Sequence, residues 1–399
     1  MPLPPRPRSP RPRVLHVVQP VDGGVARVVA DLTRAHHATA TDTDTGADGP
    51  YRIAVACPQD GPLSRAVRDL GADWYRWEAT RSPGPSLAGE VRALARLVDA
   101  VRPDVVHAHS AKAGLAARLA VRGRRPTVFQ PHAWSFEAVG GATARLALRW
   151  ERAGARWASR VVCVSAAERA TGIAAGIRAD WAVVPNGVDT ARFAPGDAAT
   201  ARATLPALDG TGDGPLVVCV ARLCRQKGQD VLLRAWETVA AQVPGARLAL
   251  VGDGPDARRL RTAAPAGVVF AGAAADAADW YRAADLVVLP SRWEGMALAP
   301  LEAMACARAV LVTDVDGARE SLPPGHAPYS LVPPEEPGAL ARAAVGLLRD
   351  PGRLAALGRQ GRRHVLTTHD VRHAADAVAA VYRGLLGTAH TECRESITS

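Results

Sequence analysis

Short runs of apolar residues alternate with helical patterns along most of the chain. The first run, Val14 to Val18, is followed by Gly23-Gly24 and by a helical pattern over Val25 to Ala35. Continuous apolar strands that alternate with helices are typical of a parallel sheet covered on both faces. The pattern therefore predicts an α/β fold of the doubly wound kind. The same series predicts further strands at Ile53–Ala56, Val105–His109, Val128–Pro131, Val161–Val164 and Ala182–Val184.

This pattern stops and then starts again in the second half of the chain. The segment Leu208 to Pro215 consists of turn-forming residues. The 399 residues are also enough for two domains of roughly 150 to 200 residues each. We therefore predict two Rossmann-like domains. The second series of strands is expected at Leu216–Ala221, Leu248–Val251, Val268–Ala271, Leu286–Leu289 and Val310–Thr313.

The same patterns give the expected boundaries of the segments. The stretch 38–50 has no periodicity and is interpreted as a surface loop, and the helical pattern Val371 to Leu386 could pack on either domain. We predict a disordered basic tail at 1–13, an N-terminal domain at 14–190, a linker region at 191–214, a C-terminal domain at 215–370, a helix at 371–386 and a frayed tail at 387–399.

The composition excludes two broad classes of protein. Hydrophobic residues make up 48% and charged residues 22% of the chain, which argues against disorder, and no uncharged apolar run is long enough to span a bilayer. The six cysteines are dispersed without a Cys-x-x-Cys spacing, and the Pro- and Arg-rich N-terminus lacks the apolar region of a signal peptide. We therefore expect reduced thiols and a cytoplasmic protein.

The chain is basic, with 49 Lys and Arg against 39 Asp and Glu and a net charge of +10. Such a surface attracts nucleic acid, anionic lipid and nucleotide substrates alike, so the charge alone chooses none of them. Only Lys112 and Lys227 are lysines, and Asn186 is the single asparagine. A position that keeps Lys or Asn against this bias needs a compact charge or a neutral side chain that tolerates positive φ, unless it survived by chance.

Three segments place polar residues where strands are expected to end, which is where ligands bind in open α/β sheets. Arg222 and Lys227 follow the first strand of the second series and could flank a diphosphate. The alternative for a single arginine there is a solvated surface residue. Gly23-Gly24 could present backbone N–H groups to an oxygen-rich ligand, or form a plain tight turn.

The third segment contains two carboxylates eight residues apart. Pro300 favours the first turn of a helix, which puts Glu302 in that turn and Glu294 in the loop before it. Both side chains then face one crevice. Glu302 alone could simply complement the helix dipole, but this does not account for Glu294.

Taken in order, these motifs resemble those of retaining GT-B glycosyltransferases of family 4, which use nucleotide sugars. The similarity extends over nearly the whole chain. The motifs that carry it are Gly23-Gly24, Asp104-Val-Val-His-Ala-His109, Val162-Cys-Val-Ser165, Val184-Pro-Asn-Gly-Val-Asp189, Arg222 to Gly228, Val251-Gly-Asp-Gly-Pro255 and the pair Glu294 and Glu302.

The resemblance implies two facing Rossmann-like domains with an interdomain cleft and the sugar donor mainly in the C-terminal one. It implies that Arg222 and Lys227 bind the diphosphate, Glu294 the sugar hydroxyls and Glu302 the ribose. His132 would meet the donor sugar, although a buried structural histidine is the alternative. The implied catalytic residues are His132, Arg222, Lys227 and Glu294. The implied donor-binding residues are Gly23, Gly24, Asn186, Arg222, Lys227, Gly252, Asp253, Glu294, Gly295, Met296 and Glu302.

The expected activity is transfer of a sugar to a hydroxyl acceptor with retention at the anomeric carbon. A lipid-linked glycan or a cell-envelope or exopolysaccharide precursor is one candidate acceptor. No metal or other cofactor is expected. The rivals are a GT-B epimerase acting on a UDP-sugar and a basic nucleic-acid-binding protein. The second is weakened because the arginines are spread along the chain and interleaved aromatics are few, so no specific nucleic acid is expected.

Several residues depart from the family pattern or stay open. Where relatives have Gly-Gly-x-x-Glu, this chain has Asp316-Gly-Ala-Arg-Glu320, which leaves the role of Glu320 open, and Ala307 replaces a common helix-ending glycine. Lys112 could face the acceptor or solvent. We interpret His107 and His109 as pointing to opposite faces of a strand, so that they share no metal ion.

The segment Ala142 to Arg160 suggests contact with an anionic membrane at the inner face of the plasma membrane. A basic stripe beside an apolar one suits a helix that lies in a lipid leaflet. The alternative is an ordinary helix that covers the sheet, with its arginines solvated. The basic stripe is Arg145, Arg149, Arg152, Arg156 and Arg160, and the apolar stripe is Leu146, Trp150, Ala153 and Trp157.

Overall fold

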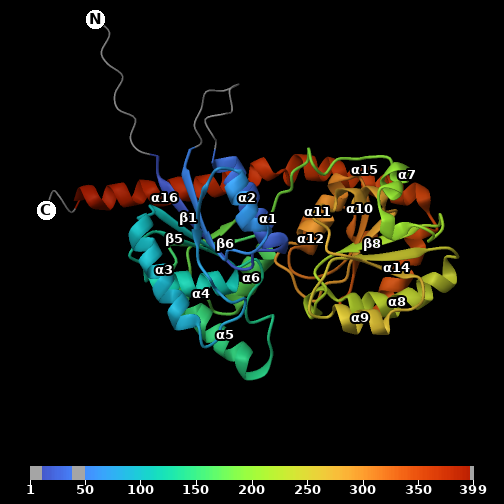
Figure 1. Ribbon diagram of the computed structural model, residues 1–399, viewed down its shortest axis with the longest axis horizontal. Coiled ribbons are helices and arrows are strands. Elements are labelled where there is room, and N and C mark those ends of the chain that lie inside the picture. Colours follow the sequence, from blue (N-terminus) through green and yellow to red (C-terminus); the bar gives the residue numbers. More distant parts are fainter. Residues whose placement is uncertain (1–10, 38–49, 396–399) are drawn as a thin grey trace, which may run out of the picture.

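The computed structural model describes residues 11–37 and 50–395, with side chains as far as residue 387. Within these residues the chain forms two α/β units, each built on its own parallel sheet (Figure 1). Seven strands form the N-terminal sheet in the order β3-β2-β1-β4-β5-β6-β7, and six form the C-terminal sheet in the order β10-β9-β8-β11-β12-β13. The prediction of two Rossmann-like domains in a GT-B arrangement is confirmed.

The N-terminal unit is the following series of elements. They are β1 (Arg13–Val18), α1 (Gly23–His36), β2 (Arg52–Cys57), α2 (Pro62–Asp69), β3 (Asp73–Arg76), α3 (Leu87–Val101), β4 (Val105–His109), α4 (Ser110–Val121), β5 (Thr127–Gln130), α5 (Gly141–Gly154), η1 (Ala155–Trp157), β6 (Arg160–Cys163), α6 (Ala166–Ala174) and β7 (Trp181–Val183).

The C-terminal unit follows in the same alternating style. Its elements are α7 (Ala198–Ala203), η2 (Pro206–Leu208), β8 (Leu216–Val220), η3 (Arg225–Lys227), α8 (Gln229–Gln242), β9 (Arg247–Val251), α9 (Ala257–Ala263), β10 (Val268–Gly272), α10 (Ala278–Ala283), β11 (Leu286–Leu289), α11 (Leu298–Ala305), β12 (Ala309–Thr313), α12 (Ala318–Ser321), α13 (Ala327–Ser330), β13 (Leu331–Val332), α14 (Pro337–Leu348) and α15 (Pro351–Thr368), before the final helix α16 (Val371–Glu395).

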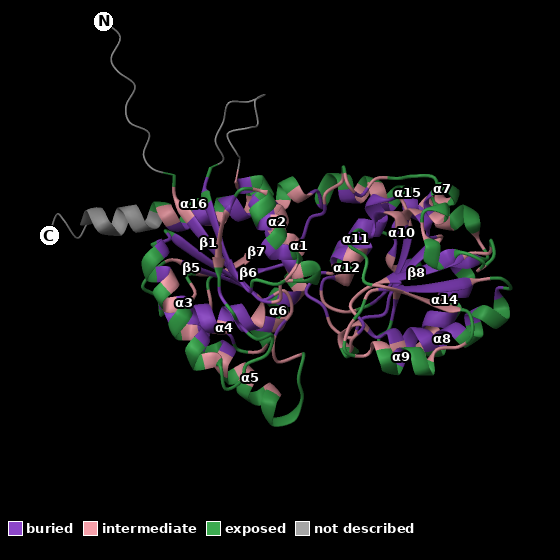
Figure 2. Cartoon of the chain, viewed as in Figure 1, coloured by how far each residue is buried: buried purple, intermediate pink, exposed green. Residues whose placement is uncertain are grey.

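Both sheets are buried on their two faces, which explains why their strands are nearly continuous apolar runs (Figure 2). In β1, Val14 and Val18 pack into one core cluster, whereas Leu15 and Val17 pack into another on the opposite face. Successive side chains of a strand point to opposite faces of the sheet, so alternate residues pack against the helices on one face or the other.

Helix α16 returns to the N-terminal unit and completes its core. Ala375, Val378 and Tyr382 are buried in the same cluster as Val14, and Tyr51 donates a 3.1 Å hydrogen bond to the carbonyl of Ala379. In Figure 1 this helix runs as a long red rod behind the N-terminal sheet. The last helix of the chain is therefore structurally part of the first domain.

Two neighbouring segments connect the domains. The chain leaves the N-terminal unit after β7 and returns between α15 and α16, and the backbone of Val188 pairs with both His369 (2.8 Å) and Val371 (3.0 Å). A Cβ built on Gly187 would lie 2.7 Å from the carbonyl oxygen of Asp370, so the two crossing segments can approach only because residue 187 is glycine. This paired crossing fixes where the two domains join.

Several expected boundaries differ from the structure. Residues 191–214 were expected to be a linker, but Phe193, Ala201 and Leu208 are buried in a C-terminal core cluster, because the turn-rich stretch follows a segment that already packs on this domain. The final helix continues to Glu395 and β1 begins at Arg13, while β3 and β13 were not expected. Most of the predicted tail and 38–50 loop lies outside the described residues. None of the described helices combines the length and the apolar character that crossing a membrane requires.

Ala307, the residue in place of a family glycine, follows helix α11 in a left-handed conformation with φ 59°. Its backbone N–H donates to the carbonyl of Met304 at 2.9 Å, so the residue takes part in the C-terminal cap. A side chain in this conformation costs about 1 to 2 kcal/mol, because its Cβ approaches the neighbouring carbonyl oxygen.

We expect Ala307→Gly to raise the free energy of unfolding by about 1 kcal/mol, because glycine removes this strain and gives back only part of it as backbone entropy. Urea unfolding measures the change. The matched control is Ala305→Gly in the last turn of the same helix, which should lower stability by about 1 kcal/mol. A loss of stability in both variants would contradict the interpretation.

Candidate active site

The loops after β8 and β9 lie directly against each other. Gly252 has φ 146°, and a Cβ built on it would lie 2.0 Å from the carbonyl oxygen of Ala221. The N–H of Leu223 donates to the carbonyl of Asp253 at 3.0 Å. Only glycine permits this approach, and it places Gly252 and Asp253 beside the backbone of Arg222.

Lys227 belongs to the short turn η3, which lies beside the loop after β11. Its Nζ donates a hydrogen bond to Oε1 of Glu294, and the same oxygen accepts a 2.7 Å hydrogen bond from Oγ of Ser291. Glu294 is 8% exposed. A Cβ built on Gly228 would lie 2.0 Å from the carbonyl oxygen of Pro290, which explains how η3 comes so close. The structure thus brings together two residues that are 67 positions apart.

Arg222 is half-buried, and its guanidinium forms no hydrogen bond or ion pair within the described part of the chain. Its carbonyl accepts from Nε2 of Gln229 at 2.9 Å, so the backbone is held while the side chain stays available. Arg222 and Lys227 therefore provide one uncommitted cation and one cation that is paired with a carboxylate.

Glu302 lies on α11, but the prediction that it belongs to the first turn is wrong, because the helix begins at Leu298 and Glu302 falls in the second turn. Its side chain is buried. Tyr281 donates a 2.7 Å hydrogen bond to its Oε2, and Nε of Arg27 lies 3.7 Å from Oε1. Burial raises the pKa of Glu302. Arg27 comes from α1 of the other domain, and its Nη1 is buried without a hydrogen-bond partner. The ribose-binding role of Glu302 stays a prediction.

The loop 294–298 is also where the two domains touch. Nδ2 of Asn186 donates to the carbonyl of Met296 at 2.7 Å, and Oγ of Ser165 donates to the carbonyl of Gly295 at 2.9 Å. A Cβ on Gly295 would lie 2.8 Å from Oε1 of Glu168, and one on Gly24 would lie 3.7 Å from Leu298. Gly24 and Gly23 are exposed at the start of α1, so this N-terminal loop faces the first turn of α11.

Glu320, whose role was left open, is committed to the domain contact. Its two carboxylate oxygens accept hydrogen bonds from the backbone of Ala166 (2.7 Å) and Ala167 (2.8 Å) in the first turn of α6. Oγ1 of Thr171 donates to Oδ2 of Asp316 at 2.7 Å. A carboxylate at a helix N-terminus is favourable because it satisfies free N–H groups. Asp316 and Glu320 therefore attach the C-terminal domain to the N-terminal one.

His132 follows β5 in a backbone conformation that is rare for a residue with a side chain. Its φ is 57°, and that of Ala133 is 114°. Glu168 holds this turn, because its two carboxylate oxygens accept from the N–H groups of Ala133 (2.6 Å) and Val164 (2.7 Å). Burial raises the pKa of Glu168 to about 7. Strain of this kind persists only where the surroundings fix it, and it is common at functional sites.

The interpretation of His107 and His109 is wrong. Residues two apart on a strand share a face, and the two rings lie with centroids 4.0 Å apart. Nδ1 of His107 contacts Oη of Tyr382 at 2.6 Å, whereas His109 contacts His16. One nitrogen from each of His16, His107 and His109 lies within 4.8 Å of the others, but both nitrogens of His109 form hydrogen bonds to other histidines. The absence of a metal stays a prediction.

Lys112 faces neither an acceptor nor solvent. It is 3% exposed, and its Nζ lies 2.5 Å from Oε2 of Glu90 on α3. It also donates to Oγ1 of Thr80 (3.3 Å) and the carbonyl of Ser82 (3.2 Å). Lys112 therefore connects its own helix, α4, to helix α3 and to the loop that precedes α3.

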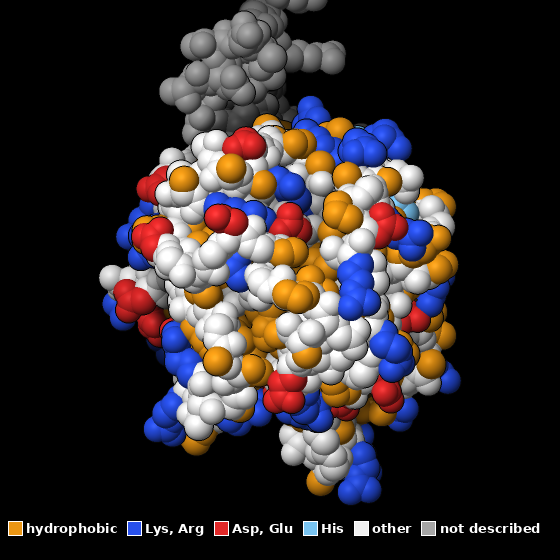
Figure 3. All heavy atoms as spheres, turned by 90° about the vertical axis from the view of Figure 1, so that its right-hand side faces the viewer, with side chains coloured by type: hydrophobic (Ala, Val, Ile, Leu, Met, Phe, Trp, Pro, Cys, Tyr) orange, Lys and Arg blue, Asp and Glu red, His pale blue; other side chains and the backbone are white. Residues whose placement is uncertain are grey.

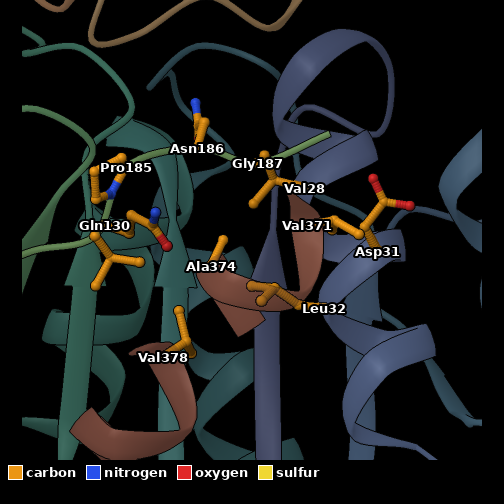
Figure 4. Close-up of a pocket in the computed structure, with 11 residues that line it drawn as sticks. Val28, Asp31, Leu32, Gln130, Pro185, Asn186, Gly187, Val371, Ala374 and Val378 are labelled. Atoms are coloured by element: carbon orange, nitrogen blue, oxygen red, sulfur yellow. The ribbon is translucent and has the colours of Figure 1, made fainter. Parts of the chain in front are cut away.

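Two hollows lie near the candidate residues. One of about 310 Å³ lies between α1, α16 and the crossing segment, and Figure 4 shows Asn186 at its edge among mainly apolar side chains such as Val28 and Val378. A second, of about 250 Å³, is lined by Glu294, Ser291 and Thr313. Of the Lys227–Glu294 pair, only Glu294 lines the second hollow.

The predicted basic and apolar stripes divide between core and surface. Trp150 and Trp157 are half-buried, and the Arg118 guanidinium lies 5.2 Å from the Trp150 ring, which supports the covering-helix alternative for both tryptophans. In contrast, Leu146 is 67% exposed beside exposed Arg145 and Arg149 on α5.

Sequence reasoning missed Arg27, Tyr281, Glu168 and His16 as members of the site region. Ser165 and Glu168 do carry a detectable signal, since Ser-x-x-Glu before a helix is a capping box, and Oγ of Ser165 accepts from the N–H of Glu168. The others depend on contacts between distant segments, which no local spacing reveals.

Comparison with known proteins gives a matching family for each domain. Residues 22–192 match the family model described as Glycosyltransferase Family 4, and residues 214–350 match Glycosyl transferases group 1. Together they include well over half of the chain, which belongs to the group 1 glycosyltransferases of family 4.

The individual relatives are similar over part of their length. The GDP-mannose-dependent α-(1-6)-phosphatidylinositol monomannoside mannosyltransferase of Mycolicibacterium smegmatis is 39% identical over 197 residues, 46% of this chain and 51% of that protein. A lipopolysaccharide core biosynthesis mannosyltransferase of Rhizobium leguminosarum bv. viciae is 34% identical over 215 residues, 51% of this chain and 60% of that protein. The chain thus spans about half to three fifths of the length of these relatives.

The fold extends over a larger share of the chain. The crystal structure of Anabaena HepE in complex with UDP-glucose matches with a TM-score of 0.77 at 24% identity, over 93% of this chain and 99% of that one. At this identity the likeness establishes the fold.

Proposed function

We propose that this chain is a retaining, metal-independent glycosyltransferase that moves a sugar from a nucleoside diphosphate sugar to a hydroxyl acceptor. The observation that carries the proposal is the arrangement around Gly295. Lys227 and Glu294 meet on one side of this residue, and the strained turn of His132 and Ala133 lies on the other. In this proposal the residues that would bind the diphosphate and the turn that would face the sugar adjoin the same domain contact.

The leaving nucleoside diphosphate gains negative charge as the bond to the sugar breaks. Arg222 and Lys227 would stabilise this charge, which is commonly the largest contribution to catalysis when the donors are held in place beforehand. The pair between Lys227 and Glu294 holds both side chains near their working positions. When a donor binds, its diphosphate can pair with the ammonium of Lys227, and the carboxylate of Glu294 can then accept hydrogen bonds from the sugar hydroxyls.

Neither candidate carboxylate is placed as a free nucleophile. Glu294 accepts from Lys227 and Ser291, and Glu302 is buried against Tyr281. This supports a front-face reaction, as the family resemblance implies. In it the acceptor oxygen bonds to the anomeric carbon while the sugar–phosphate bond breaks, and the departing phosphate oxygen takes the acceptor proton.

The names of the relatives narrow the choice of donor and acceptor. One relative is named as GDP-mannose-dependent, both are named as mannosyltransferases, and their names refer to a phosphatidylinositol mannoside and a lipopolysaccharide core. We therefore infer that the donor carries a hexose and that GDP-mannose is the first donor to test. We infer that the acceptor is a lipid-linked glycan of the cell envelope or an exopolysaccharide precursor, at the cytoplasmic face of the membrane.

The rivals are distinguished by simple observations. An epimerase would convert a UDP-sugar without any acceptor. A nucleic-acid binder needs clustered basic charge, but on the end of the C-terminal domain shown in Figure 3 the Lys and Arg side chains are interspersed with Asp and Glu. This distribution favours binding of small phosphorylated ligands over a long polyanion.

We expect Lys227→Ala, and likewise Arg222→Ala, to lower turnover on the order of a hundredfold or more, as the loss of one held charge donor does. Lys227→Arg should also be impaired, because a planar guanidinium cannot take the position of a compact ammonium beside Glu294 and Ser291. The assay follows nucleoside diphosphate release from GDP-mannose and UDP-glucose with candidate acceptors, in excess EDTA.

The control is Arg225→Ala, a change in the same turn at an exposed arginine that lies 5.6 Å from the Trp293 ring. It should keep turnover within about threefold of the unmodified chain, in line with the small effect of surface substitutions. Unchanged turnover in both Lys227→Ala and Arg222→Ala would overturn the assignment, and loss of activity in EDTA would contradict metal independence.

We further propose that α5 rests on an anionic membrane. Leu146 (67% exposed) and Val139 (38% exposed) provide apolar contact at this end of the domain, and Arg145 and Arg149 are exposed beside Leu146. Figure 1 shows α5 at the lower edge of the N-terminal unit. Basic side chains near an anionic leaflet contribute about 1 kcal/mol each.

The double variant R145Q/R149Q should therefore bind anionic vesicles roughly thirtyfold more weakly, since two such contributions amount to about 2 kcal/mol. Co-sedimentation with vesicles that contain an anionic phospholipid measures this, with neutral vesicles as reference. The matched control is R359Q/R363Q, two exposed arginines on α15 of the other domain. Equal loss in both double variants, or no binding at low salt, would refute the proposed surface.

A further inference from the structure

Three histidines form a continuous hydrogen-bonded chain that ends at the candidate site. Nε2 of His132 lies 3.2 Å from Nδ1 of His109, and Nε2 of His109 lies 2.9 Å from Nδ1 of His16. His16 and His109 lie on the adjacent strands β1 and β4 and are completely buried, whereas His132 is only partly buried. The hydrogen-bonded row of histidines therefore extends from the core of the N-terminal domain to the surface of this domain that faces the C-terminal domain.

Burial favours the neutral form of all three rings. Burial lowers the pKa of His16 and of His132 to about 3, and burial together with the neighbouring histidines lowers the pKa of His109 well below its usual value. A neutral imidazole has one N–H and one lone pair. Both nitrogens of His109 are hydrogen-bonded to other histidines. The N–H protons of the three rings can therefore be arranged in only two ways, and the tautomer of one ring determines the tautomers of the other two.

The buried end of the chain decides between these two orders. Nε2 of His16 is buried and has no hydrogen-bond partner. In one order this atom would carry a proton that it cannot donate, and in the other it keeps only a lone pair. Buried N–H groups without an acceptor are the rarer defect in proteins. The favoured order is therefore donation from Nδ1 of His16 to Nε2 of His109, and from Nδ1 of His109 to Nε2 of His132.

We propose that His109, supported by His16, is a positioning residue that holds His132 in the tautomer with its proton on Nδ1, so that His132 donates a hydrogen bond to an oxygen of the bound sugar donor. In the described residues Nδ1 of His132 has no partner of its own, so it is the ring atom left for a ligand. The proposal rests on the proposed function, because it takes the ligand to be a nucleotide sugar with hydroxyl and phosphate oxygens.

The backbone around His132 supports a positioning role. The positive φ values of His132 and Ala133 are maintained by Glu168 from one side, and the ring is held by His109 from the other. A side chain that only fills space needs neither a strained turn nor a hydrogen bond to one defined ring nitrogen. The two restraints together determine where the ring lies and which nitrogen faces away from the core.

His107 provides a matched control on the same face of the same strand. It is fully buried like His109, but it contacts Tyr382 through Nδ1 and has no bond to the chain of three histidines. Replacing it removes an imidazole of equal burial without touching His132. Asn at position 109 is a conservative variant, because its side-chain N–H occupies nearly the place of Nδ1 of histidine.

The first experiment measures the tautomer directly, in the protein without ligand. Two-bond ¹⁵N–¹H NMR of histidine-labelled full-length protein distinguishes the two neutral forms, and His132→Gln assigns the signals of His132. We expect the Nδ1–H form of His132 in the unmodified chain and a shift towards the Nε2–H form in His109→Leu. An Nε2–H form, or an imidazolium, in the unmodified chain at neutral pH would overturn the proposal.

The second experiment separates positioning from folding. His109→Leu should lower kcat on the order of a hundredfold, as the loss of a positioned hydrogen-bond donor does. The Kd for free GDP or UDP, measured by calorimetry, should change less than about threefold. His109→Asn should recover most of kcat, and His107→Leu should stay within about threefold of the unmodified chain. A His109→Leu enzyme with normal kcat would refute the role, as would equal losses in His107→Leu and His109→Leu.

Failure of the proposed function would look different from failure of this inference. If the unmodified chain releases no nucleoside diphosphate from any donor, the proposed function fails while the NMR tautomer still tests the proton order. If His109→Leu does not fold by circular dichroism, the tautomer of His132 in the unmodified chain and the kcat of His109→Asn decide the matter.

Discussion

The close approach of Gly295 to the N-terminal domain is the constraint on which the rest of the site depends. A Cβ at this position would lie 2.8 Å from Oε1 of Glu168 and 3.0 Å from the backbone nitrogen of Ala133. Glu294, the partner of Lys227, is the next residue along the chain, and Ala133 follows His132. The position of one glycine therefore sets the spacing between the Lys227–Glu294 pair and the turn that carries His132.

Polar contacts and the paired crossing keep the domains at this distance. Ser165 donates to the carbonyl of Gly295, Asn186 donates to the carbonyl of Met296, and Glu320 accepts from the first turn of α6. Each such bond contributes only about 1 kcal/mol, but they involve different elements around the same loop. The same contacts show that Asn186, the single asparagine, and Glu320 both take part in the domain contact.

The sequence was sufficient for the fold because strands buried on both faces leave apolar runs that turns and helices separate. It was also sufficient to place Glu302 on a helix that contains Pro300, although α11 begins at Leu298, so Glu302 falls in the second turn and not in the predicted first one. It could not reveal the partners of these residues: Arg27 and Glu302, or His16 and His109, come from distant segments. Lys112 was misread for the same reason, because Glu90 lies on another helix. Strand alternation does predict the orientation of His107 and His109, because residues two apart on a strand point to the same face. The prediction that they point to opposite faces is therefore wrong.

The most direct test of this account is the turnover of Gly295→Ala. Because a misplacement of about 1 Å can cost on the order of a hundredfold in rate, kcat for sugar transfer should fall by about that factor. The Kd for free nucleoside diphosphate should change less than about threefold, since Arg222 and Lys227 lie within one domain. Gly346→Ala on α14, where an added Cβ meets no atom within 4 Å, is the control and should match the unmodified chain. A Gly295→Ala protein with unchanged kcat would contradict the claim that this contact assembles the site.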